Sequence, residues 1–291
     1  MNMRKDGRRV RILPVSVFTG WMLVLATNGA EVRTCTVRSE SMRKDVPVAV
    51  VLPEGYNRDA GKRYPVAYLL HGAGGDEREY LTRTGKIKAA VDRYGFVAVC
   101  PDGAKLSWWM DSPVDGSYRY EMFVARELVA WVDKSLQTVP ARNRRALVGA
   151  SMGGYGAMRI GCGHRDVFGA VYSIHGAVEL RPFADVERWQ LAKRLDPDKT
   201  LGPVWDRYSV LERAKDVRND ELELYMVIGS DDQYFLAGNR KLHELFTTNK
   251  VAHTYVEIRA KTQDESAHTW AFQAIGETEI YPRLAEFFTR K

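Results

Sequence analysis

The chain has 291 residues, with 43 Lys or Arg against 37 Asp or Glu and a net charge of +6. This length suits one large α/β domain or two small ones, and it is ample for a sizeable hydrophobic core. Part of the positive charge lies at the N-terminus, in Arg4, Lys5, Arg8, Arg9 and Arg11. The rest of the chain is close to balanced in charge, so we expect no nucleic acid as a partner.

The N-terminal segment is typical of a secretory signal. Its basic residues precede an apolar run, Ile12 to Ala26, which ends near the small residues Gly29 and Ala30. We expect cleavage after Ala30, export to the periplasm or the extracellular space, and a single mature domain over residues 31–291. An uncleaved anchor and an over-extended start of translation are the alternatives. Because the run is short and interrupted by polar residues, no stable membrane insertion is expected after processing.

Short apolar runs alternate with helical segments along the mature chain. Strands are predicted at 46–52, 64–70, 96–100, 145–148, 170–174, 222–228 and 254–258, and helices at 87–93, 120–136, 155–160, 236–248 and 282–289. This alternation predicts an α/β fold, with a mostly parallel sheet and helices on both faces. Segment 178–219 lacks a clean period, and we expect it to pass over the sheet edge, where it could cap a site.

The most informative motif is Gly149-Ala150-Ser151-Met152-Gly153, which reads Gly-x-Ser-x-Gly. A predicted strand precedes it and a predicted helix follows, as in the nucleophile elbow of serine hydrolases. Such a turn is tight, so small residues are needed on both sides of the serine. A Gly/Ser-rich turn without chemistry is the alternative, because the motif is common by chance. The flanking strand and helix favour Ser151 as a nucleophile.

A serine nucleophile needs a base and an acid that orients the base. In this type of fold the chain order is Ser, then Asp or Glu, then His. His268 lies in a polar loop after the last predicted strand, which is where the base is expected. The other histidines after Ser151 fit other roles: His164 a surface or helix-cap position, His175 a strand end before the acid, His243 a helix surface and His253 the start of a strand.

Two acidic residues, Asp231 and Asp232, follow the strand predicted at 222–228. Either side chain could orient the base. Asp pairs are also common in turns without chemistry, so position alone leaves both residues open.

Two backbone N–H groups are needed to bind the oxyanion of the tetrahedral intermediate. The amide of Met152, one residue past the nucleophile, is the first candidate. The second is expected from the glycine-rich loop His71–Gly75, through Ala73. His71 itself is expected to brace this loop rather than to act as a base.

Aromatic residues follow the strand predicted at 96–100. Trp108 and Trp109 are expected near the acyl pocket, where their rings could stack on a sugar or a phenolic acyl group. Ordinary packing of a long loop is the alternative, and the sequence does not decide between the two.

Cysteine and histidine spacing indicates neither a metal site nor a bound cofactor. The three cysteines, Cys35, Cys100 and Cys162, are an odd number and fit no disulfide framework. Cys100 and Cys162 are expected to be buried free thiols, although one bridge among the three remains open.

Together these segments resemble the esterase D and tributyrin esterase group of α/β-hydrolases. This group includes feruloyl and acetylxylan esterases, S-formylglutathione hydrolases and mycolyltransferases. The matching motifs are Tyr68-Leu69-Leu70-His71-Gly72, Cys100-Pro101-Asp102-Gly103, Asp111-Ser112-Pro113 with Tyr120-Glu121, Gly149 to Gly154, Gly229 to Asp232 and His268-Thr269-Trp270. They span roughly residues 45–290 and imply the α/β-hydrolase fold with a Ser-Asp-His triad.

The resemblance also bears on the choice of acid. The group's Gly-Thr-x-Asp turn falls on Gly229 to Asp232, which implies Asp232, and its His-x-Trp motif falls on His268 to Trp270. The chain departs from the group in the loop 262–267, which is not glycine-rich.

The sequence therefore predicts an exported serine esterase that acts on small acyl esters, with carbohydrate-linked acetyl or feruloyl groups as candidate substrates. An acyltransferase with the same triad is the first alternative. A binding protein on an inactive hydrolase fold is the second, and it would require that a triad member be missing.

Overall fold

The computed structural model describes residues 29–290, so most of the expected signal segment, residues 1–28, lies outside the described residues. An eight-stranded sheet runs through the molecule in the order β1-β2-β4-β3-β5-β6-β7-β8. The strands are β1 (Glu31–Ser39), β2 (Lys44–Leu52), β3 (Val66–Leu70), β4 (Val97–Pro101), β5 (Arg145–Ala150), β6 (Ala170–Ile174), β7 (Glu223–Gly229) and β8 (Thr254–Ile258). β2 pairs antiparallel with both β1 and β4, and the strands from β4 to β8 are parallel.

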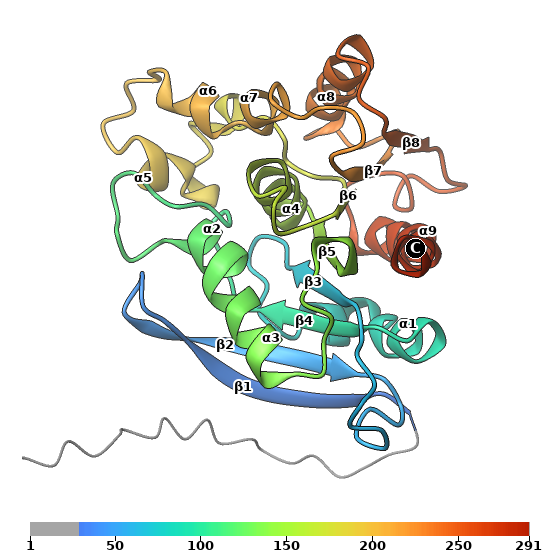
Figure 1. The fold of residues 1–291 in the computed structure, drawn as a ribbon. Helices are drawn as coiled ribbons and strands as arrows, with labels where there is room; N and C mark the ends of the chain where they lie inside the picture. The colour runs from blue at the N-terminus through green and yellow to red at the C-terminus, as the bar shows by residue number, and fades with distance from the viewer. Residues whose placement is uncertain (1–28, 291) are drawn as a thin grey trace, which may run out of the picture.

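Helices cover both faces of this sheet, as the alternating pattern predicts (Figure 1). One core lies between the sheet and α1 (Ile87–Tyr94) and α9 (Trp270–Thr289). The other core lies between the opposite face of the sheet and three helical segments. These are α4 (Met152–Gly163), α8 (Leu236–Thr248) and the segment that begins with α2 (Tyr120–Met122). Strands β3 to β6 are buried along their whole length, which explains their continuous apolar runs. The structure thus has the α/β architecture that the sequence predicts, with a mostly parallel sheet and helices on both faces.

The helix expected over 120–136 is present, but its geometry changes along its length. After α2, the turn Phe123–Leu128 is π-helical, and α3 (Val129–Ser135) continues the same helix. Phe123, Val124 and Leu128 are buried in this turn and belong to the core on this face of the sheet.

The structure corrects two sequence-based expectations. The last helix was expected to begin at Pro282, but α9 begins at Trp270 and contains Pro282 in its interior. Burial of Phe272, Ile280 and Leu284 on its core face outweighs the lost backbone hydrogen bond of the proline. The structure also adds β1, an edge strand that was not among the predicted strands and whose residues are mostly half-buried or exposed.

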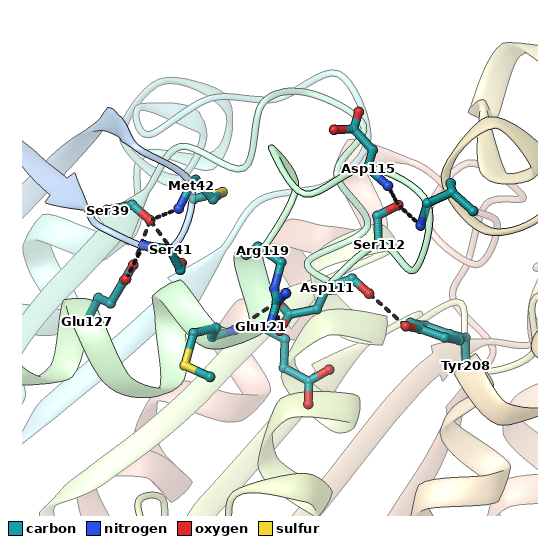
Figure 2. Close-up of polar contacts among 12 residues, drawn as sticks. Ser39, Ser41, Met42, Asp111, Ser112, Asp115, Arg119, Glu121, Glu127 and Tyr208 are labelled. Atoms are coloured by element: carbon teal, nitrogen blue, oxygen red, sulfur yellow. Dashed lines mark hydrogen bonds and ion pairs between the residues drawn. The ribbon is translucent and has the colours of Figure 1, made fainter.

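Segment 178–219 forms a cap of short helices, α5 (Leu191–Leu195), α6 (Val204–Tyr208) and α7 (Val210–Ala214). Side chains tie it to the loop that follows β4. The Tyr208 hydroxyl donates to the carbonyl of Asp111 at 2.8 Å, and the Ser112 hydroxyl donates to the carbonyl of Arg194 at 2.6 Å. Figure 2 shows the first contact and Ser112 accepting the amide of Asp115. The cap is thereby held at the carboxyl edge of the sheet.

The three cysteines are free thiols, and Cys100 and Cys162 are buried as expected. Burial raises the pKa of the Cys35 thiol to about 11 and that of Cys162 to about 12. Because the thiolate is the reactive form, neither is a nucleophile near neutral pH.

Helix α9 buries a carboxylate in the core. Glu277 is 0 % exposed and accepts hydrogen bonds from Thr84 at 2.7 Å, Tyr281 at 3.0 Å and Gln273 at 3.1 Å. Burial raises the pKa of this carboxyl to about 7. Between its ordinary pKa of about 4.5 and 7, the folded chain holds a proton that the unfolded chain has released. The free energy of unfolding therefore falls as pH rises through this window, by about 3 kcal/mol at most.

We expect Glu277→Gln to remove this pH dependence, because the amide stays neutral throughout the window. Urea unfolding of both proteins at pH 5 and pH 8 measures it. The free energy of unfolding of the variant, relative to wild type, should be higher at pH 8 than at pH 5. An equal difference at the two pH values would show that Glu277 is ionised in the folded protein.

Candidate active site

Ser151 is the single residue between the end of β5 and the start of α4. Its backbone has φ 56° and ψ −118°, a region that non-glycine residues rarely adopt. Hydrogen bonds hold this conformation on both sides. The Ser151 N–H donates to the carbonyl of Ile174 at 3.0 Å, and its carbonyl accepts from Tyr155 at 3.0 Å and Ala177 at 3.2 Å. The sharp turn points the hydroxyl away from the sheet, at the carboxyl edge.

The two glycines of the motif are required by close backbone contacts. A Cβ atom at Gly149 would lie 2.0 Å from the carbonyl oxygen of Gly153, and one at Gly153 would lie 1.8 Å from that of Leu70. Neither neighbour is a flexible side chain, so any larger residue would force the strand and helix apart. The Gly-x-Ser-x-Gly pattern thus has a steric cause in this chain.

The structure brings Ser151, His268 and Asp232 into one hydrogen-bonded chain. His268 Nε2 lies 2.9 Å from Ser151 Oγ, and His268 Nδ1 lies 2.8 Å from Asp232 Oδ2. The carboxylate can only accept, which assigns the proton to Nδ1 and leaves Nε2 free to accept from the serine hydroxyl. The three side chains come from the ends of β5 and β7 and from the loop before α9.

Asp232 is fixed by its surroundings. Its side chain is buried, and Oδ1 accepts the backbone N–H groups of Tyr234 at 3.0 Å and Phe235 at 2.9 Å. These bonds leave Oδ2 directed at the imidazole. A carboxylate held in this way stabilises the imidazolium that forms during attack.

Asp231 has different contacts. Its carboxylate accepts the Ser266 hydroxyl, and its backbone N–H donates to the carbonyl of Ser266 at 2.9 Å. It therefore pins the loop 262–267, the segment that departs from the group's glycine-rich pattern. The geometry pairs Asp232, and not Asp231, with the histidine.

Ala73 lies in the loop after β3, and hydrogen bonds to His71 and Glu79 hold this loop in place. His71 accepts the N–H of Gly103 at 2.7 Å through Nε2, and its Nδ1 lies 2.7 Å from the carbonyl of Gly72. The N–H of Gly72 donates to Glu79 Oε1 at 2.9 Å. His71 is 1 % exposed, as expected for a residue that supports the loop. It is not part of the hydrogen-bonded chain formed by Ser151, His268 and Asp232.

Met152 is the first residue of α4, so its N–H has no acceptor within the helix. The N-terminal end of a helix also carries a partial positive charge, which favours an anion there. Ala73 lines the same cavity as Ser151. That these two amides bind a substrate oxyanion stays a prediction.

Ser151 and His268 open into a cavity of about 260 Å³. Aromatic side chains dominate its wall: Trp108, Trp189, Tyr234, Phe235 and Trp270. The cap contributes Trp189, whose backbone carbonyl accepts the Trp108 indole N–H at 2.9 Å. Segment 178–219 therefore forms part of the cavity wall.

The two tryptophans expected near the acyl pocket have different positions. Both side chains are buried, but Trp108 lines the cavity and Trp109 does not. The Trp109 indole donates to the carbonyl of His71 at 3.1 Å, and its Cβ occupies the space beside Gly156. For Trp109 the structure supports the packing alternative, with the ring placed behind the loop that carries Ala73.

Sequence reasoning missed other members of the wall. Tyr234 and Phe235 follow Asp232 after one intervening residue, Gln233, so an aromatic pair close to the expected acid was the available signal. Trp189 had no comparable signal, because it lies in the cap segment without a clean period. His243 and His253 form a pair 2.8 Å apart, and His164 contacts Glu121 at 3.3 Å; none of the three lines this cavity.

Comparison with known proteins agrees with this geometry. Residues 39–276 match the protein family described as "Putative esterase". The chain belongs to this esterase family. It is 28 % identical to esterase Rv1288 of Mycobacterium tuberculosis over 236 residues, which are 72 % of this chain and 51 % of that protein. The chain thus spans about half the length of this relative.

Other similar proteins match over more of their length. An acetyl esterase of Caldicellulosiruptor saccharolyticus is 23 % identical over 80 % of this chain and 90 % of its own. A ferulic acid esterase superposes with a TM-score of 0.73 at 21 % identity, over 89 % of this chain and all of that one. An S-formylglutathione hydrolase from Agrobacterium tumefaciens superposes with a TM-score of 0.75 at 19 % identity, over 92 % of this chain and 99 % of that one. These two likenesses establish the α/β-hydrolase fold.

Proposed function

We propose that this chain is a serine carboxylic-ester hydrolase that uses Ser151, His268 and Asp232. The observation that carries the proposal is the continuous chain of contacts, 2.9 Å from Ser151 to His268 and 2.8 Å from His268 to Asp232. Family membership supports the same reaction class, and no triad member is missing.

In the first half of the reaction, Ser151 Oγ attacks the ester carbonyl carbon and its proton passes to His268 Nε2. The carbonyl oxygen becomes an oxyanion, which the N–H groups of Ala73 and Met152 bind. Collapse of this intermediate breaks the bond to the alcohol oxygen. His268 returns the proton to that oxygen, so the alcohol leaves neutral and the acyl group stays on Ser151.

In the second half, water replaces the alcohol. His268 Nε2 takes a proton from the water as its oxygen attacks the acyl carbon, and then gives this proton to Ser151 Oγ. The products are a carboxylic acid and the free enzyme. Throughout, Asp232 keeps the imidazole in one orientation.

The cavity supports a small acyl group. Its volume of about 260 Å³ is at the low end for a ligand site, and its aromatic walls suit an apolar or aromatic group. Of the two tryptophans expected near the acyl pocket, we propose Trp108 alone as a substrate-binding residue. The names of an acetyl esterase and of ferulic acid esterases among the relatives favour carbohydrate-linked acetyl or feruloyl esters as substrates.

A panel of esters with a common p-nitrophenyl leaving group, from acetate to long acyl chains, tests the proposal. Feruloyl and acetylated-sugar esters extend the panel. We expect the highest kcat/KM for short or aromatic acyl groups. No hydrolysis of any of these esters would overturn the proposal, and net transfer to an added sugar alcohol instead of to water would make the chain an acyltransferase.

We also propose export, from the basic and apolar layout of residues 1–30. No helix within residues 29–290 is long and apolar enough to cross a membrane. Residues 31–291 are proposed as the mature domain, because β1 begins at Glu31. N-terminal sequencing of protein recovered outside the cytoplasm tests this, and an N-terminus at Met1 would contradict cleavage.

A further inference from the structure

The active-site cavity holds a second histidine that the proposed mechanism does not use. His175 follows β6 and lines the cavity, yet its side chain is only 3 % exposed. Its ring centroid lies 4.1 Å from that of His268, with 35° between the ring planes. Its Nδ1 is buried and has no hydrogen-bond partner among residues 29–290. Ring contacts thus hold this side chain with its Nδ1 unpaired.

The backbone of His175 is held in an unusual conformation. Its φ is 37°, and its N–H donates to the carbonyl of Val227 at 2.7 Å. Phe272 lies 5.4 Å from the His175 ring and 34° from parallel. Such strained positions for a non-glycine residue persist where the surroundings enforce them, and they concentrate at functional sites.

The ring of His175 is neutral in this environment. Burial lowers its pKa well below the ordinary value of 6.5, and the charge that His268 gains on protonation lowers it further. Two ionisable groups lie close to it, His268 in the loop before α9 and Asp232 in the loop after β7; one side-chain N or O atom of each of the three residues lies within 4.8 Å of those of the other two. Arg188 of the cap lines the same cavity. Phe272 and Gln273 of α9, which also line this region, carry no charge.

His268 is enclosed by rings. The His175 ring lies against it at a tilt of 35°, and the edge contact with Phe235, at 4.9 Å and 78°, restricts it further. We propose that His175 is a positioning residue for His268: its uncharged ring fixes the plane of the base and presents a π face to the imidazolium that forms on attack. Aromatic faces attract cations, and a charged neighbour at this distance would repel the imidazolium instead. This proposal rests on the proposed function, because it acts through His268.

Three substitutions of His175 distinguish the contribution of its aromatic face to catalysis from that of its ring nitrogens and from that of its volume. His175→Ala and His175→Leu remove the aromatic face, and we expect kcat for p-nitrophenyl acetate to fall about 10- to 100-fold with little change in KM. His175→Phe keeps the face without a titratable nitrogen, and it should retain about a third or more of wild-type kcat. The rate at which a fluorophosphonate labels Ser151 should fall by a similar factor in the His175→Ala and His175→Leu variants.

The controls separate this proposal from a structural role and from the proposed function itself. His243→Phe, outside the cavity, should leave kcat unchanged, and thermal unfolding of every variant checks that it is folded. Wild-type kcat in His175→Leu, or an equal loss in Leu and Phe, overturns the positioning role. Ser151→Ala is the separate test of the function: if it is inactive while all His175 variants are fully active, only the present inference fails.

Discussion

Ser151→Ala is expected to lower kcat about 10⁶-fold, the largest effect of any single substitution in this chain. Without Oγ there is no acyl-enzyme, and His268 Nε2 loses the donor that lies 2.9 Å away. The fold should survive, because the Ser151 side chain makes no capping hydrogen bond to α4. Steady-state hydrolysis of p-nitrophenyl acetate, with circular dichroism of both proteins, measures the two parts of this expectation.

Ser41→Ala is a matched control, since Ser41 is an exposed serine in the turn between β1 and β2. It should keep wild-type kcat. A loss of less than about 100-fold in a folded Ser151→Ala protein would be incompatible with a serine nucleophile at this position.

The second large effect is expected at Asp232. Asp232→Asn preserves the size of the side chain but replaces a carboxylate oxygen with an amide that cannot stabilise an imidazolium. The histidine then adopts the wrong tautomer for accepting the Ser151 proton. We expect kcat to fall on the order of 10³- to 10⁴-fold while KM changes little.

Asp231→Asn is the matched control for the acid, being the adjacent residue with the same substitution. Asp231 contacts Ser266 rather than the base, so we expect a loss of about tenfold or less from a loosened loop. Both variants are measured with one ester substrate. The reverse order would assign the acid to Asp231, and two small losses would show that the orienting carboxylate comes from elsewhere.

Local pattern was sufficient for several strands and helices. The strands at Ala170–Ile174 and Thr254–Ile258 and the helix at Leu236–Thr248 have the bounds that the sequence predicts. Pattern failed where tertiary contacts decide. β1 exists because β2 offers it a pairing edge, and α9 passes through Pro282 because its apolar face is buried.

The same distinction holds for the site. The order of Ser151, an Asp pair and His268 along an α/β chain restricts the chemistry before any coordinates are known. Choosing between Asp231 and Asp232 requires knowing where each of these adjacent side chains points. Their positions along the chain do not provide this information. The two tryptophans are a similar case: both are buried in the core, but only Trp108 lines the cavity.

Covalent labelling with a fluorophosphonate tests the central claim most directly, because the reagent reacts with a serine that a neighbouring base activates. Intact mass spectrometry followed by peptide mapping identifies the modified residue. The triad predicts a single adduct on Ser151, absent from Ser151→Ala and formed slowly in a protein with His268→Ala. An adduct on another serine, or no adduct at all in the folded wild-type protein, would contradict the account.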